Sequence, residues 1–334
     1  MSGYVPDYKI MGSRTGIAGR RHNLKHLVPF KYEKEWRVVM QCAACRREAV
    51  VFQPYSGKHL CPVHFTKDFE AKAKRAIRRN RWLLPGDHTA VVLAGNAADA
   101  ALLLFLHKLV KDRRDVKLSA IAIDEGMAGD AGRAVADLCG GEIFSGSFAE
   151  RYGTTRDAIV RAEGPAAAGR ICNVLAGDLA AEIASSHGIT RLALATTVDD
   201  RALEFFSDLL AGTVEETLFV PETLGTARVP VIRPFREIPK TEVYRYAELC
   251  DVTPGGAGAG KAEENSAAGA ALAAYDARRP ATKFALANLA GTLAEIAGKN
   301  AAPQEICPAC GSPTRAGRCF TCSVREKYTR EPGS

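Results

Sequence analysis

The spacing of the cysteines is the strongest constraint on what this chain can fold into. Seven cysteines and one histidine stand in four pairs, with two residues between the members of each pair: Cys42 and Cys45, Cys61 and His64, Cys307 and Cys310, Cys319 and Cys322. A close pair holds one metal ion from a tight turn, and two pairs complete a tetrahedron. Three thiolates with an imidazole, or four thiolates, suit zinc. We therefore predict two structural zinc sites, one toward each end of the chain.

The composition is that of a globular protein. The chain has 334 residues, 47% of them hydrophobic and 25% charged, which fits about two domains. The longest apolar stretch, residues 100–106, is far shorter than the roughly 18 residues of a membrane-spanning helix. The first ten residues lack the apolar block of a secretory signal. We therefore expect a cytoplasmic protein without a membrane contact, whose paired cysteines bind metal instead of forming disulfides.

Positive charge is concentrated at the start of the chain. Residues 1–39 hold eight Lys or Arg and three acids, so they supply +5 of the net charge of +7. We interpret this segment as a loose basic tail, or as an extension ahead of a true start at Met40.

A second basic stretch, residues 65–82, has helical periodicity. It is interpreted either as a solvated helix face or as a phosphate-binding face, with these candidate RNA contacts: Lys72, Arg75, Arg78 and Arg79.

Strand and helix patterns alternate after residue 85. Apolar runs predict strands over 88–94, 116–123, 191–195 and 228–232, and helical periodicity predicts helices over 97–110, 133–138, 171–187, 199–210 and 240–249. This alternation predicts an α/β fold, a doubly wound parallel sheet with helices on both faces. Ligands of such sheets bind at the carboxyl ends of the strands. The turns after Ala94, Ile123 and Ala195 are therefore the candidate site.

The chain is expected to divide into four parts. These are the tail 1–39, an N-terminal zinc finger 40–66, the α/β domain 67–300 and a C-terminal zinc ribbon 303–328. Within the α/β domain, the Gly/Ala-rich residues 254–274 predict a loop leading into a weak helix, and a last helix is predicted over 281–298. Three cysteines stand outside the pairs, at 139, 172 and 250, and a cysteine of this kind is most often a small buried hydrophobe.

Several motifs resemble the TtuA-type tRNA 2-thiouridine synthetases of the PP-loop ATP pyrophosphatase superfamily. They are Cys42-Ala-Ala-Cys45-Arg-Arg-Glu-Ala, Leu60-Cys61-Pro-Val-His64-Phe65, Ile123-Asp-Glu-Gly126, Arg233-Pro-Phe-Arg236-Glu-Ile-Pro239 and the closing cysteine pairs. The resemblance covers about residues 40–327. It implies a PP-loop fold of the HUP type, a cytoplasmic and dimeric protein, tRNA as the partner, and a reaction that adenylates a uridine with ATP and then replaces oxygen by sulfur.

The resemblance also implies an altered ATP site. Members read S-G-G-x-D-S where this chain has Ala94-Gly-Asn-Ala-Ala-Asp99, so one glycine is kept and both serines are absent. The family positions carried over are Gly95, Asn96, Asp99 and, at the end of the second strand, Asp124. Asp99 would repel a phosphate that approaches the helix terminus, although a carboxylate itself is favourable there. We therefore expect weak or absent ATP binding.

Other family positions are also altered. Cys172 corresponds to one cysteine of a C-x-x-C motif whose other cysteine and two following arginines are missing, and Asp199 belongs to an acidic pair that is kept. Because a [4Fe–4S] cluster normally needs at least three thiolates, we expect the cluster to be absent. Cys172 and Asp199 are thus family catalytic positions that we expect to be inactive.

These observations leave three hypotheses open. The first is a tRNA-binding, catalytically impaired family member that acts as the partner subunit of an intact PP-loop thiolase paralogue. The second is an active ATP-dependent tRNA sulfurtransferase with an altered loop. The third is a zinc-containing scaffold or nucleotide-binding module that does not act on RNA.

Overall fold

The computed structural model describes residues 40–126, 140–214, 223–225, 228–252, 266–300, 305–311, 313–314 and 317–329. The chain divides after Val39 into two units, and all of these residues belong to the second. The predictions for the tail 1–39, for a helix over 133–138 and for most of the Gly/Ala-rich loop lie outside the described residues. Within the described residues, no helix combines the length and the apolar character needed to cross a membrane.

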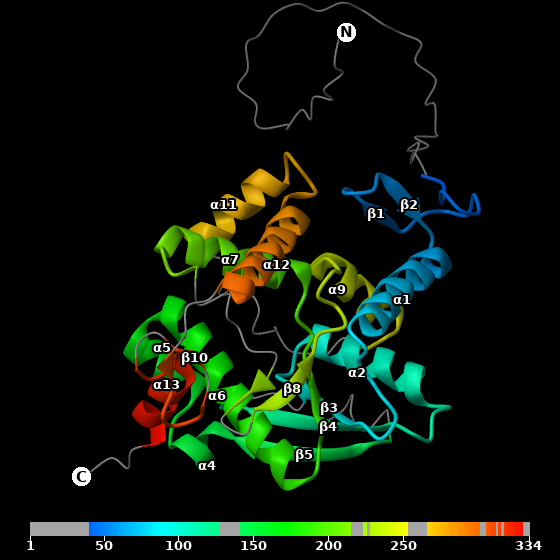
Figure 1. Cartoon of the computed structure of the whole chain (residues 1–334). Coiled ribbons are helices and arrows are strands. Elements are labelled where there is room, and N and C mark those ends of the chain that lie inside the picture. Colours follow the sequence, from blue (N-terminus) through cyan, green and yellow to red (C-terminus); the bar gives the residue numbers. More distant parts are fainter. Residues whose placement is uncertain are drawn as a thin grey trace, which may run out of the picture. The chain divides into compact units, whose positions relative to one another are not determined.

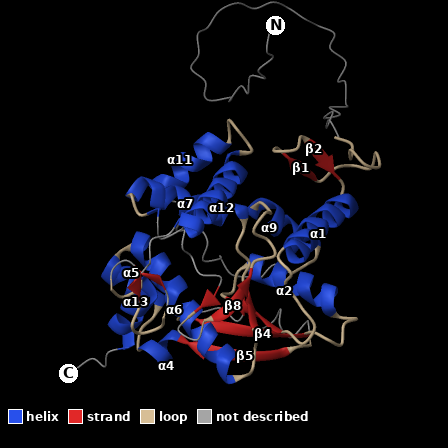
Figure 2. Cartoon of the chain, viewed as in Figure 1, coloured by secondary structure: helices blue, strands red, loops and turns tan. Residues whose placement is uncertain are grey.

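The main sheet of this unit, with strands β4, β5 and β8 labelled in Figure 2, has six strands. Their order is β5-β4-β3-β6-β8-β7. The first five strands in this order pair in parallel, and β7 pairs antiparallel to β8. The strands are β3 (His88–Leu93), β4 (Lys117–Asp124), β5 (Glu142–Ser147), β6 (Arg191–Ala193), β7 (Thr223–Leu224) and β8 (Val229–Ile232). The predicted α/β class with a mostly parallel sheet is confirmed.

Helices cover both faces of the sheet (Figure 1). On one face lie α1 (Pro62–Arg79), α2 (Ala97–Val110) and α9 (Lys240–Leu249), and on the other α4 (Phe148–Tyr152), α5 (Arg156–Glu163), α6 (Pro165–Ser186) and α13 (Phe320–Thr329). Alternation along β3 explains this, because Val91 and Leu93 point into the first core and Ala90 and Val92 into the second. A strand buried on both faces needs the continuous apolar sequence seen here.

Three further helices pack on one another beside the sheet. They are α7 (Val198–Ala211), α11 (Ala267–Asp276) and α12 (Thr282–Asn300), and α7 also contacts α9 (Figure 1). The N-terminus of α7 is fixed by a capping box, in which Thr197 and Asp200 bond to each other's backbone N–H groups. This cap determines where the acidic pair of α7 lies.

The two cysteine-rich ends form small modules of their own. The N-terminal module is a hairpin of β1 (Val51–Gln53) and β2 (Lys58–Leu60) followed directly by α1, and the C-terminal module pairs β9 (Glu305–Ile306) with β10 (Pro313–Thr314) ahead of α13. Helix α1 begins at Pro62, three residues before the predicted start, because proline at the first helical position supplies a suitable φ angle and lacks an N–H. The proposed domain boundary at 66 therefore falls inside a continuous helix.

A candidate site at the carboxyl ends of the strands

The strand order reverses beside β3, and this reversal locates the candidate site. From β3 the chain adds β4 and β5 on one side, and it then returns to add β6 and β8 on the other. In open α/β sheets, ligands bind at such a switch point, outside the carboxyl ends of the strands. The turns after β3 and β6 border this point. They and the first turns of the helices that follow carry Asn96, Asp99, Thr197 and Asp200.

The turn after β3 binds its own polar side chains. Gly95 has a φ of +82°, which suits glycine. The Oδ1 atom of Asn96 accepts hydrogen bonds from the N–H groups of Ala98 at 2.9 Å and of Asp99 at 3.0 Å. The Oδ2 atom of Asp99 accepts from the N–H of Ala94 at 2.8 Å. Three backbone donors that could face an anion are thus already bonded to side-chain oxygens of the turn itself.

Asp99 is a buried carboxyl with other carboxyls nearby. Its residue surface is 8% exposed. Burial, together with the negative charges of Glu125 and Asp200, raises the pKa of Asp99 from 3.8 to about 7. The hydrogen bonds from the backbone of the turn oppose this shift, because they stabilise the charged form. The group therefore changes charge close to neutral pH.

The raised pKa predicts that Asp99 makes folding stability depend on pH. The folded state holds the proton up to about pH 7 and the unfolded chain releases it near 3.8, so stability falls as the pH rises from about 4 to 7. Asp99→Asn keeps an acceptor for the Ala94 N–H without a charge. Relative to the unaltered protein, we expect this variant to gain stability on the order of 2–4 kcal/mol between pH 5 and pH 8.

Melting curves at several pH values measure this effect. The matched control is Asp124→Asn, which changes an exposed carboxylate that accepts from the N–H of Gly126 at 2.8 Å in the neighbouring turn. If Asp99→Asn and the unaltered protein lose stability in parallel between pH 5 and pH 8, the carboxyl is ionised throughout that range in the folded state.

An ion pair between separate elements lies next to Cys172. Glu125, the residue after β4, accepts a hydrogen bond from the guanidinium of Arg156 at the start of α5, and both side chains are largely buried. Cys172 lies on α6 and is 0% exposed. Burial and the nearby charge of Glu125 raise its pKa to about 11, while Arg156 opposes the rise. The sequence did not reveal this pair, because 31 residues separate its members.

The acidic pair of α7 is held by lysines from two other helices. Asp199 accepts from the backbone N–H of Lys240 at 2.7 Å and from Nζ of Lys283 on α12 at 2.6 Å. The ammonium of Lys240 lies 3.7 Å from the carboxylate of Asp200. Asp199 thus joins the N-termini of α7 and α9 to α12. Sequence reasoning identified Asp199 but not Lys283, which lies 84 residues away.

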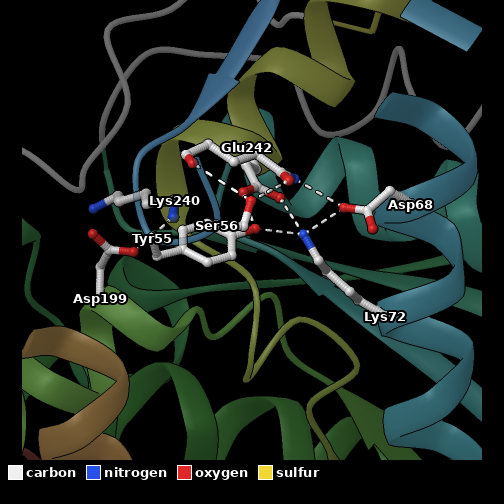
Figure 3. A network of polar contacts seen from close by, with 8 residues as sticks. Tyr55, Ser56, Asp68, Lys72, Asp199, Lys240 and Glu242 are labelled. Carbon is white, nitrogen blue, oxygen red and sulfur yellow. Dashed lines mark hydrogen bonds and ion pairs between the residues drawn. The ribbon is translucent and has the colours of Figure 1, made fainter. Parts of the chain in front are cut away.

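A second polar network connects α9 to the N-terminal module (Figure 3). The hydroxyl of Tyr55, in the turn between β1 and β2, donates to Oε1 of Glu242 at 2.5 Å and accepts from Nζ of Lys72 at 2.6 Å. Nζ of Lys72 also lies 2.6 Å from Asp68 and 3.0 Å from Glu242, whose side chain is 5% exposed. Glu242 stands two residues after Lys240 on α9. The β1–β2 hairpin and α1 therefore contact α9, the helix that also contacts the acidic pair of α7.

The N-terminal cysteine set has the geometry of a zinc site. The ligand atoms of Cys42, Cys45, Cys61 and His64 all lie within 4.8 Å of one another. Sγ of Cys45 and Sγ of Cys61 are 3.6 Å apart, and Nδ1 of His64 is 3.3 Å from Sγ of Cys61. A tetrahedral zinc with bonds of about 2.3 Å to sulfur requires similar separations. Cys61 directly precedes α1 and His64 lies in its first turn, so the helix start positions two ligands.

The C-terminal set has the same arrangement with four thiols. Sγ of Cys310 and Sγ of Cys319 are 3.5 Å apart, and the four ligand atoms, which include those of Cys307 and Cys322, lie within 4.8 Å of one another. The module packs on α6, where Arg325 of α13 lies 3.4 Å from the buried carboxylate of Asp178. Both sets could bind zinc, and four protein ligands leave no open position for catalysis.

The four basic residues singled out on α1 have different surroundings. Arg75 and Arg78 are exposed. The guanidinium of Arg79 is exposed but pairs with Glu237. Lys72 belongs to the Tyr55 network, and its side chain is only 17% exposed. Of the four, Arg75 and Arg78 are therefore the residues that remain available for phosphate contacts.

Comparison with known proteins agrees with the motifs. Residues 41–66 match the family model described as the 2-thiouridine synthetase TtuA, N-terminal LIM domain. The chain is 26% identical over 326 residues to the tRNA 2-thiolation protein NcsA of Haloferax volcanii, covering 86% of this chain and 98% of the relative. It is 27% identical over 307 residues to the tRNA-5-methyluridine(54) 2-sulfurtransferase of Thermus thermophilus, covering 87% and 92%.

A solved structure shares the fold and overturns one expectation. It is the U34-tRNA thiolase NcsA from Methanococcus maripaludis with its [4Fe-4S] cluster, which aligns with a TM-score of 0.71 and 21% identity over 89% of this chain and 99% of that one. The prediction that the cluster is absent is contradicted by this neighbour. The prediction was wrong because it counted only the thiolates at family positions, of which Cys172 is the one present, and such a count does not determine cofactor content.

The family model matches the N-terminal module, and the two relatives each match more than four fifths of the chain. The parallel sheet, the switch point beside β3 and the two four-ligand modules occur in one polypeptide. These findings support the resemblance drawn from the motifs: over most of its length the chain is similar to proteins of the tRNA thiolase family, TtuA and NcsA among them.

Proposed function

We propose that this protein binds tRNA in the cytoplasm, is impaired in the ATP-dependent step of thiolation, and acts as the partner subunit of an intact PP-loop thiolase. The observation that carries the proposal is the turn after β3. Asn96 and Asp99 accept the hydrogen bonds of three backbone N–H groups there. A phosphate needs such donors at a helix N-terminus. It would have to displace Asn96 and approach the buried carboxyl of Asp99.

The acidic pair supports the same proposal. Both oxygens of the Asp199 carboxylate are bonded, one to Lys283 and the other to the backbone N–H of Lys240. A carboxylate used in this way joins three helices. A thiolase in complex with this chain would then carry out the chemistry, and the dimeric assembly implied by the family resemblance offers a surface for such a complex.

The proposal is tested with purified full-length protein, an unmodified tRNA transcript, ATP and a sulfide source. We expect tRNA binding, but no pyrophosphate release and no 2-thiouridine when the nucleosides are examined by mass spectrometry. Adding the intact thiolase from the same organism should yield 2-thiouridine faster than the thiolase alone. Thiolation by this chain alone would instead establish the second candidate, an active sulfurtransferase, which is favoured by the similarity to the Thermus thermophilus enzyme over 92% of that enzyme's length.

RNA binding by the outer face of α1 predicts a defined salt dependence. Arg75 and Arg78 lie three residues apart on the helix, so they share a face. A variant that makes one phosphate contact fewer should have a slope of log K against log salt that is smaller by about 0.7–0.9. We expect Arg75→Ala/Arg78→Ala to lower the slope by about 1.5 and to weaken binding to all tRNA sequences alike.

Fluorescence anisotropy of labelled tRNA at several salt concentrations gives the slope. The matched control is Arg278→Ala/Arg279→Ala, which removes two exposed arginines from the segment between α11 and α12. An equal change of slope in the two double variants would mean that the effect comes from net charge and not from the α1 face.

A further inference from the structure

We propose that the N-terminal zinc module stacks an unpaired RNA base on the exposed ring of Phe52. The inference rests on the proposed tRNA binding and adds the chemistry of one contact. Protein side chains recognise unpaired RNA mainly by stacking aromatic rings on splayed bases, with cations nearby for the phosphates. The hairpin provides both elements: the stacked rings of Phe52 and His59, and exposed cations close to them in the sequence.

The hairpin presents a stacked pair of rings with one ring open to solvent. Phe52 on β1 lies directly opposite His59 on β2. Their ring centroids are 4.5 Å apart and the planes differ by 25°. Phe52 remains 52% exposed, although a phenylalanine is usually buried. The strand alternation places Val50 on the same face, and it is 37% exposed. A base added to Phe52 would extend the stack that His59 begins.

The support beneath these rings is rigid. The opposite face of the hairpin is packed, since Gln53 is 2% exposed and Leu60 is 5% exposed. The turn that carries the first two zinc ligands is bonded to β2 at this point, because the N–H of Ala43 donates to the carbonyl of His59 at 2.8 Å. The backbone that carries His59 is therefore held by the turn that carries Cys42 and Cys45. A preorganised ring loses little conformational entropy when a base stacks on it.

The charge around the rings suits an anionic partner. Residues 40–61 contain three cations, Arg46, Arg47 and Lys58, and a single acid, Glu48. All three cations are exposed. The exposed Lys67 follows on α1, on the same helix as Arg75 and Arg78. An aromatic ring among cations favours RNA over an uncharged apolar protein surface, because the phosphates next to a stacked base need compensating charge.

The test measures binding of the full-length protein to a fluorescein-labelled tRNA transcript and to a short unstructured RNA. The variants are Phe52→Ala, which removes the ring, and Phe52→Trp, which keeps a stacking surface. The matched control is Phe320→Ala. Phe320 is 45% exposed, but the guanidinium of Arg170 lies 5.1 Å from its ring centroid and covers one side of it. Because Phe52 and Phe320 are both largely exposed, the alanine variants should fold normally, and melting temperatures verify this.

We expect Phe52→Ala to weaken RNA binding by about 5- to 100-fold with an unchanged salt slope, since stacking carries no charge. Phe52→Trp should bind at least as tightly as the unaltered protein, and the emission of its new tryptophan should be quenched by RNA. Phe320→Ala should bind like the unaltered protein.

Two results overturn the inference in distinguishable ways. If the unaltered protein binds tRNA and Phe52→Ala binds it equally well, the stacking contact is refuted while the proposed function stands. If the unaltered protein binds no RNA, the proposed function fails and the inference fails with it. A change in sedimentation with Phe52→Ala, without a change in RNA affinity, would assign this face to a protein contact and also refute the proposal.

Discussion

Replacing Cys61 by serine is expected to remove one of two zinc ions and to unfold the N-terminal module. Serine keeps a hydroxyl at the position before α1, where serine is a favoured cap. The loss of stability therefore reports the loss of the thiolate ligand rather than of the helix cap. Zinc contributes about 10 kcal/mol to small isolated modules. Because this hairpin also packs on α1, we expect a smaller loss, of roughly 3–5 kcal/mol.

Zinc content by mass spectrometry and unfolding by denaturant measure the two parts of this prediction. The control is Cys250→Ser, because Cys250 belongs to neither four-ligand set and its Sγ lies 3.6 Å from Nζ of Lys108. This variant should keep both zinc ions. A Cys61→Ser protein that still binds two zinc ions would show that the N-terminal set is not a tetrahedral site of these four residues.

The second large effect is expected at the network of Tyr55, Lys72 and Glu242. Lys72→Met removes the cation and leaves the carboxylate of Glu242, whose side chain is 5% exposed, with only the hydroxyl of Tyr55 as a partner in the network. Breaking a buried ion pair on one side costs about 3–5 kcal/mol, because an uncompensated charge stays buried. We expect about 3 kcal/mol here, since the Lys72 side chain is 17% exposed.

A double-mutant cycle separates this charge effect from the change in packing. Combining Lys72→Met with Glu242→Gln removes both charges, so the double variant should be less destabilised than the sum of the single variants. The control is Lys74→Met on the same helix. Lys74 pairs with Glu70 at 3.0 Å, but its side chain is 39% exposed, so we expect a cost within about 0.5 kcal/mol. Equal costs for Lys72→Met and Lys74→Met would contradict the buried-pair explanation.

The same network also connects the β1–β2 hairpin to the candidate site. Tyr55 contacts Glu242, and Lys240, two residues earlier on α9, contacts the acidic pair of α7 (Figure 3). The ring of Tyr55 also lies 4.8 Å from that of Phe284 on α12. Contacts at both Lys240 and Glu242 therefore fix the position of α9 beside the candidate site. This gives the N-terminal module a structural role in addition to the RNA contact that we propose for it.

Short-range patterns predicted much of the fold. The helices at 97–110 and 240–249 have the predicted bounds, and the strand predicted over 88–94 is one residue shorter in the structure. The strand β5 (Glu142–Ser147) was missed, because none of its residues is buried and its sequence therefore lacks an apolar run. It pairs in parallel with β4 along one edge, through backbone groups that any sequence can offer. An edge strand that pairs only through its backbone therefore has no distinctive amino-acid composition from which to predict it.

The basic stretch of α1 also shows that the sequence pattern does not reveal which distant residues will be in contact. The sequence grouped Lys72 with Arg75 and Arg78 as one cationic face. In the structure Lys72 pairs with Glu242, which is 170 residues away, whereas the two arginines remain exposed. Helical periodicity identifies which residues share a face, but it contains no information about the acid that another helix places against that face.

The sequence by itself determined the α/β class and the two sets of four potential metal ligands, and it predicts a site beyond strands at 88–94 and 191–195. These depend on residue spacing within a few positions, because a metal-binding turn, a helix face and a buried strand each have a fixed local geometry. Only the tertiary structure decided which charges are neutralised: Glu125 by Arg156, Asp199 by Lys283 and Glu242 by Lys72. The physical reason is that the energy of a buried charge depends on distance in space, and the partners here are separated by 31 to 170 residues along the chain.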